Sequence, residues 1–137
     1  MTSERTRRGE RGTAAVEMAV LLPLLWLILL GAIDFGRVFY ASITIADAAQ
    51  QAAVFAARSQ VLPAAAVVEA IAYGEAGGFL RAENTVLEGP TLVAGEKVFL
   101  ARVRLTYTFR PLTPIPLAGP IPVSAVATAP LPGTVLP

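Results

Sequence analysis

The stretch from Gly12 to Ile33 reads GTAAVEMAVLLPLLWLILLGAI, and it decides how the rest of the chain can fold. Between Thr13 and Ile33 the only charged residue is Glu17. A helix of this length, at about 1.5 Å per residue, spans roughly 30 Å, which is the thickness of the hydrocarbon core of a bilayer. The composition therefore predicts one transmembrane helix over residues 13–33.

The residues before this stretch, MTSERTRRGERG, form a basic leader peptide over residues 1–12, which we expect to be disordered. An excess of arginine marks the cytoplasmic side of a membrane helix. We therefore expect a single-pass protein of the cytoplasmic (inner) membrane, with its N-terminus in the cytoplasm and its C-terminal domain in the periplasm. A secretory signal peptide is the rival interpretation. It requires small residues at its cleavage site, and Gly31-Ala32-Ile33 is a poor match.

The composition excludes several classes of function. The chain has 137 residues, of which 55% are hydrophobic and 15% charged, and its net charge of +1 gives no sign of nucleic-acid binding. Cysteine and histidine are absent, which rules out disulfides, thiolate metal sites and Cys or His catalysis. We find no phosphate-binding loop and no nucleophile elbow. We therefore expect no enzyme activity, cofactor, metal or small-molecule substrate.

The region from Ala41 to Arg58 is rich in alanine and contains neither proline nor glycine. Alanine is the best helix former, so we expect the membrane helix to continue outward without a break over residues 34–58. Six of its residues recur at helical spacing and form one small-residue face. This face packs either against the chain's own domain or against neighbouring subunits. Its members are Ile45, Ala48, Ala49, Ala52, Ala53 and Ala56.

The remainder, residues 59–137, is predicted to form a small α+β domain outside the membrane. It begins with a short helix from Pro63 to Tyr73 and continues with segments in which apolar residues alternate with polar ones. The predicted strands are two short pieces flanking Gly89-Pro90, a long strand over Val98–Phe109 and a return strand over Ile121–Ala129.

A sheet this small needs a helix to cover its apolar face, and the small-residue face is the available cover. The predicted fold class is therefore α+β: a single N-terminal transmembrane helix that continues into a long amphipathic helix, packed on a small antiparallel β-sheet, as in pilins. On the other face of the sheet, Arg102 and Arg104 are interpreted as a solvated surface rather than a binding patch.

Gly12 and Glu17 belong to a wider pattern. A basic leader, a glycine, four small or apolar residues, a glutamate and an apolar helix together resemble the processing site of type IV prepilins. With Asp34-Phe35-Gly36-Arg37 and the Ala-rich region from Asp47 to Arg58, the chain resembles TadE-like minor pilins, or pseudopilins, of the tight-adherence (Flp type IVb) pilus system. Major pilins of that system commonly carry tyrosine after the glutamate, whereas this chain has Met18.

The resemblance implies cleavage after Gly12 by a prepilin peptidase, with Thr13 as the new N-terminus. Gly9 is a poorer site, because the fifth residue beyond it is Ala14 rather than glutamate. Glu17 would then be the subunit-assembly charge, paired with the Thr13 amine of a neighbour. Alternatively, the Glu17 carboxyl lies near the cytoplasmic interface and stays hydrated or protonated.

The function that the resemblance implies is that of a structural and assembly component of a Flp/Tad pilus, involved in pilus biogenesis and adhesion. The partners it implies are the membrane, the prepilin peptidase, other pilin or pseudopilin subunits and the Tad secretion machinery. Such a protein would remain in the membrane or enter the pilus. The alternative is an uncleaved single-pass membrane scaffold of a secretion or pilus machine.

Overall fold

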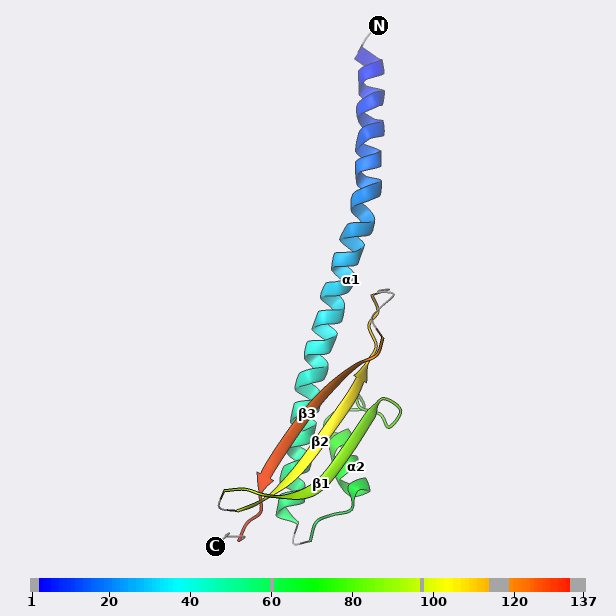
Figure 1. Cartoon of the computed structure of the whole chain (residues 1–137). Coiled ribbons are helices and arrows are strands. Elements are labelled where there is room, and N and C mark those ends of the chain that lie inside the picture. Colours follow the sequence, from blue (N-terminus) through cyan, green and yellow to red (C-terminus); the bar gives the residue numbers. More distant parts are fainter. Residues whose placement is uncertain (1–2, 60, 97, 114–118, 134–137) are drawn as a thin grey trace.

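The structure is a computed structural model that describes residues 3–59, 61–96, 98–113 and 119–133 (Figure 1). A long helix carries a small α+β domain on its C-terminal half, and the N-terminal half extends away from that domain (Figure 1). The predicted fold class is confirmed. The elements in chain order are α1 (Ser3–Arg58), α2 (Ala65–Glu75), β1 (Thr85–Ala94), β2 (Phe99–Phe109) and β3 (Ile121–Pro130).

Helix α1 runs without a break from Ser3 to Arg58, as predicted for the part beyond Thr13. Pro23 lies inside the helix, which continues through it although a proline removes one backbone hydrogen bond. The expectation of a disordered leader was wrong, because residues 3–12 are helical. The leader contains no proline, so its backbone can extend the helix once the apolar segment has nucleated it.

The three strands form one antiparallel sheet in the order β1-β2-β3, with β2 in the centre. Strand β2 pairs with β3 along all but its first residue, from Leu100 opposite Pro130 to Phe109 opposite Ile121. The long strand and the return strand expected from the sequence are therefore confirmed to within one residue at their ends.

The two short strand pieces expected on either side of Gly89-Pro90 belong to a single strand, β1. Its register against β2 shifts between Glu88 and Thr91, as in a β-bulge. Gly89 has a φ of 113°, and a Cβ at this position would lie 2.7 Å from the carbonyl oxygen of Arg102. Because only glycine tolerates both conditions, this dipeptide bends one strand instead of separating two.

The core lies between the sheet and the outer half of α1, which β2 and β3 cross in Figure 1. All six members of the small-residue face are at most 1% exposed. They belong to one buried cluster with Ala101, Val103 and Leu105 of β2. The small-residue face thus packs against the chain's own sheet, which was one of the two alternatives.

The short helix α2 begins at Ala65 rather than at Pro63 and buries Val68 and Ala72 in the same core. Near its end, the Tyr73 hydroxyl donates a hydrogen bond to the Glu69 carboxylate at 2.6 Å. Burial and this carboxylate raise the pKa of Tyr73 to about 12, so the hydroxyl keeps its proton at neutral pH.

On the face of the sheet that points away from α1, β2 carries polar side chains from Arg102 onward. Arg102 and Arg104 are both exposed there, and Arg104 lies 3.6 Å from the Glu88 carboxylate across the β1–β2 ladder. An exposed pair of this kind contributes less than about 1 kcal/mol to the free energy of unfolding. The structure agrees with the interpretation of this face as a solvated surface.

Candidate functional site

The apolar segment of α1 stands clear of the domain. Its exposed large hydrophobic side chains, between Val16 and Ile33, show 44% to 70% of their surface. Among the described residues, α1 is the one helix long and apolar enough to cross a membrane, and none of its most apolar window is buried. A surface of this size and composition needs lipid or other protein to cover it.

The predicted processing residues lie at the start of this segment, all within α1. Gly12 and Thr13 are consecutive helical residues, and Glu17 is an exposed residue about one turn beyond Thr13. Glycine is the least favourable residue in a helix after proline, so Gly12 lowers the cost of unwinding the backbone at this position. Glu17 is flanked by Val16 and Met18, which are 65% and 55% exposed. Its carboxylate therefore has exposed apolar neighbours on both sides along the chain.

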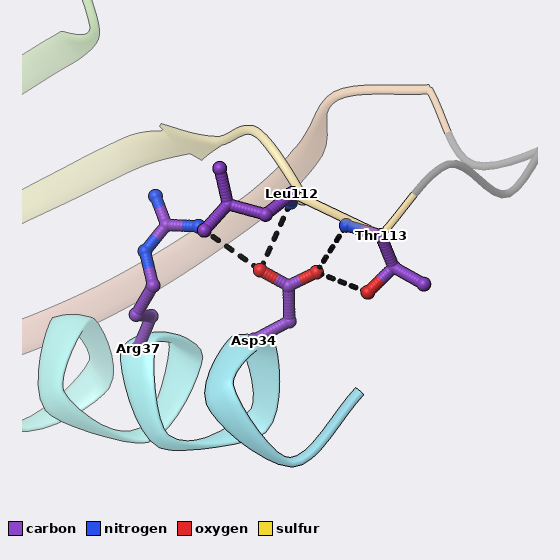
Figure 2. Close-up of polar contacts among 4 residues, drawn as sticks. All are labelled: Asp34, Arg37, Leu112 and Thr113. Carbon is purple, nitrogen blue, oxygen red and sulfur yellow. Dashed lines mark hydrogen bonds and ion pairs between the residues drawn. The ribbon is translucent and has the colours of Figure 1, made fainter. Parts of the chain in front are cut away.

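Asp34 marks the end of the exposed apolar segment and joins the helix to the segment after β2 (Figure 2). The residue is 8% exposed, and its carboxylate accepts four hydrogen bonds. One carboxylate oxygen accepts from the Leu112 N–H and from Arg37, each at 2.9 Å. The other accepts from the N–H of Thr113 at 2.7 Å and from its hydroxyl at 2.5 Å. We call these four residues the Asp34 clasp.

The clasp favours the ionised form of Asp34. The hydrogen bond from the Thr113 hydroxyl, followed by that from the Leu112 N–H, lowers the pKa of Asp34 from 3.8 to about 2. The sequence places Asp34 and Arg37 three apart, so they share a helix face and can pair. It did not predict the bonds to Leu112 and Thr113, which are 78 and 79 positions away and follow no local pattern.

Aromatic side chains gather beside the clasp. The ring of Tyr40 meets that of Phe79 edge-on at 5.3 Å between centroids, and Phe79 lies against Tyr107 at 5.1 Å. The guanidinium of Arg37 stands 5.0 Å from the ring centroid of Phe109. Arg37 is therefore held by a carboxylate and by an aromatic ring.

These residues line an open groove of about 260 Å³ between α1 and the domain, which we call the boundary groove. Within the described ranges, no three acidic side chains gather closely enough to hold a metal ion. The lining residues of the boundary groove are Ile33, Gly36, Arg37, Tyr40, Phe79, Tyr107 and Phe109.

Comparison with known proteins addresses the N-terminal region. Residues 12–54 match the model of the TadE-like protein family. This segment starts at the predicted cleavage glycine and includes the exposed apolar segment, Asp34 and most of the small-residue face. No curated protein and no solved structure matches the chain. Over this N-terminal region, the chain is similar to the TadE-like protein family.

Proposed function

We propose that the protein is a pseudopilin, a membrane-anchored subunit that takes part in the assembly of a Tad pilus. The family match supports an association with the Tad pilus machinery. The observation that carries the proposal is the division of α1: the domain covers only the outer half and leaves the apolar half exposed. The role is structural, and no catalytic step is assigned to the chain.

In this proposal residues 13–33 span the inner membrane. The arginine-rich leader stays in the cytoplasm, and residues 59–137 lie in the periplasm. The Asp34 clasp supports this placement, because it holds Leu112 and Thr113 of the domain beside Asp34, where the apolar segment of α1 ends. The domain would then rest at the membrane surface.

A second exposed surface supports assembly with other subunits. Phe35, Phe39 and Ile43 are 75%, 60% and 48% exposed and follow i, i+4, i+8 along α1. The stripe begins after Asp34 and reaches about 15 Å beyond Ile33, which is outside a hydrocarbon core filled by residues 13–33. The domain packs on other faces of the helix. The apolar helix of a neighbouring subunit is the cover that fits this stripe.

The proposed processing step removes the leader. A prepilin peptidase would hydrolyse the Gly12–Thr13 peptide bond, which removes four arginines and two glutamates and leaves an α-amine on Thr13. The Glu17 carboxylate of one subunit and the Thr13 amine of its neighbour would then neutralise one another in the membrane. This pairing would set the axial register between the helices.

The test is to express the full chain in cells that contain the native prepilin peptidase and to sequence the N-terminus of the membrane-extracted protein. We expect a start at Thr13 that depends on the peptidase. Gly12→Val should block cleavage, whereas the matched variant Gly9→Val should leave it unchanged. A start at Met1 or Thr2 in the parent chain would favour the uncleaved scaffold, and a start beyond Ile33 would indicate a secreted domain.

The same cells test the role of Glu17. Glu17→Ala should insert in the membrane and lose co-purification with the other pilus subunits. Normal co-assembly of this variant would argue for the alternative in which the carboxyl is simply hydrated near the cytoplasmic interface.

A further inference from the structure

Gly36 forms part of the α1 wall of the boundary groove. In a helix interior, glycine is less favourable than alanine by about 1 kcal/mol. A Cβ at Gly36 would meet no other atom within 4 Å, so packing within the chain does not require glycine there. The missing side chain leaves an apolar channel between α1 and the rings of Phe79, Tyr107 and Phe109.

A polar cavity of about 410 Å³ adjoins the groove. Its volume lies in the ~300–1,000 Å³ range that is typical of small-molecule sites. The groove and the cavity share Arg37 and Tyr107, so an apolar space and a polar space meet at these two side chains. The cavity is lined by Arg37, Glu83, Asn84, Tyr107, Thr108 and Arg110.

The charges in this polar cavity favour an anion. Glu83 is its one acidic lining residue, and the Glu83 carboxylate lies 3.6 Å from Arg81. Arg37 uses one of its nitrogens for Asp34. In the part of the chain that the structure describes, no carboxylate forms an ion pair with Arg110. Two guanidinium groups therefore retain donors that can face a ligand in the cavity.

We propose that the boundary groove and the polar cavity together bind one phospholipid of the membrane that α1 spans. The glycerol end of an acyl chain lies in the groove beside Gly36, the chain continues past Ile33 into the hydrocarbon core, and the phosphate accepts hydrogen bonds from Arg110 and Arg37. The planar guanidinium matches the oxygens of a phosphate. Tyr40 and Tyr107 have apolar rings with a polar end, which suits the headgroup level of a bilayer.

This inference rests on the proposed membrane placement of residues 13–33. That placement puts Ile33 at the edge of the hydrocarbon core and Gly36 and Arg37 at the level of the lipid phosphates. An apolar segment of a neighbouring subunit would also fill the groove. It would leave Arg110 without an anion, whereas a phospholipid satisfies the groove and the cavity with one molecule.

The experiment uses the full chain, purified in detergent, stripped of lipid and titrated with phosphatidylglycerol. Native mass spectrometry counts the bound lipids. We expect one lipid that persists at detergent concentrations that remove the others. Gly36→Leu, which fills the groove, should weaken this binding at least about tenfold. Its matched control is Gly31→Leu, because a Cβ at Gly31 also meets no atom within 4 Å and this residue does not line the groove.

The phosphate contact has its own variants. Arg110→Gln should weaken binding about tenfold, which is the effect of losing one hydrogen bond to a charged group. Arg104→Gln, on the solvated face of the sheet, should leave the affinity unchanged. Diacylglycerol, which has acyl chains and no phosphate, loses the contacts to both Arg110 and Arg37 and should bind the parent chain more weakly than phosphatidylglycerol binds Arg110→Gln. Thermal unfolding followed by circular dichroism checks that each variant is folded.

The inference is overturned if Gly36→Leu and Gly31→Leu retain the lipid equally, or if diacylglycerol binds as tightly as phosphatidylglycerol. It is also overturned if Gly36→Leu loses a bound second copy of the chain and keeps its lipid. Failure of the proposed function is a separate result. A chain that starts at Thr13 in the membrane and holds no specific lipid contradicts only the lipid site, whereas a chain absent from the membrane contradicts the proposed function.

Discussion

The two halves of α1 share one helical backbone and carry opposite kinds of side chain. Before Asp34 most are large, and the exposed large hydrophobic side chains between Val16 and Ile33 show 44% to 70% of their surface. Beyond Asp34 the small-residue face, which runs from Ile45 to Ala56, is at most 1% exposed. Alanine permits the sheet to approach the helix closely, and leucine does not. Side-chain size therefore indicates which half the chain covers itself and which half its surroundings must cover.

The largest expected effect comes from making the same truncation in the two regions. Leu105 on β2 is fully buried against the small-residue face, whereas Leu25 is 63% exposed on the apolar half of α1. Leu105→Ala should lower the free energy of unfolding of the domain by about 2–5 kcal/mol, because it removes buried methyl groups and leaves a cavity. Leu25→Ala should change it by less than about 0.5 kcal/mol. Urea unfolding of the full chain in detergent, followed by circular dichroism, measures both. Equal losses would contradict the comparison.

A smaller effect is expected when the outer half is given the side chains of the apolar half. Ala52→Leu places three extra carbons in a fully buried position, and overpacking of this kind costs about 1–3 kcal/mol. The matched control is Ala46→Leu, which lies on the exposed side of the same helix. The same unfolding assay applies. If Ala52→Leu is as stable as Ala46→Leu, then the close packing of helix and sheet does not depend on alanine in the small-residue face.

The smallest effect at neutral pH is expected at the Asp34 clasp, where the two halves meet. The pKa of Asp34 is lowered from 3.8 to about 2, so the ionised carboxylate stabilises the fold fully above pH 3.8. This contribution is lost as the pH falls through about 2. The unfolding midpoint of the parent chain should therefore decrease more steeply between pH 4 and pH 2 than that of Asp34→Asn.

The control for the clasp is Asp47→Asn, which changes an exposed aspartate on the same helix. This variant should follow the parent chain over the whole pH range. If Asp34→Asn also follows the parent chain, then the hydrogen bonds from Leu112 and Thr113 do not depend on the charge of Asp34.

Local periodicity was sufficient to predict most of the fold. Spacing along the helix identified Ile45 and the five alanines as one face, and alternation identified β2 and β3 to within one residue. Gly89-Pro90 was misread as a break because the fit of Gly89 against the Arg102 carbonyl involves a second strand. A strand bent by a bulge and two separate strands have the same local pattern.

The candidate site was predicted less completely. The predicted cleavage glycine and Glu17 come from a contiguous motif, and the family match covers that region. The Asp34 clasp and the boundary groove depend on contacts between α1 and residues that follow α2. Phe79 and Tyr107, for example, are ordinary aromatic residues in the sequence, and only the fold brings them beside Tyr40. Single-sequence patterns do not contain such long-range contacts.

The clasp has a mechanical consequence for how the domain moves. The carboxylate of Asp34 fixes the segment after β2 at one end of the outer half of α1, and the small-residue face fixes the sheet along the rest of that half. The outer half of α1 and the domain therefore move together as one lever, and this lever pivots on the apolar half of α1. From Asp34 to Arg58 the lever is about 36 Å long. A change of about 10° in the tilt of the apolar half displaces the far end of the domain by roughly 6 Å, so the angle of the apolar half determines where the sheet is presented.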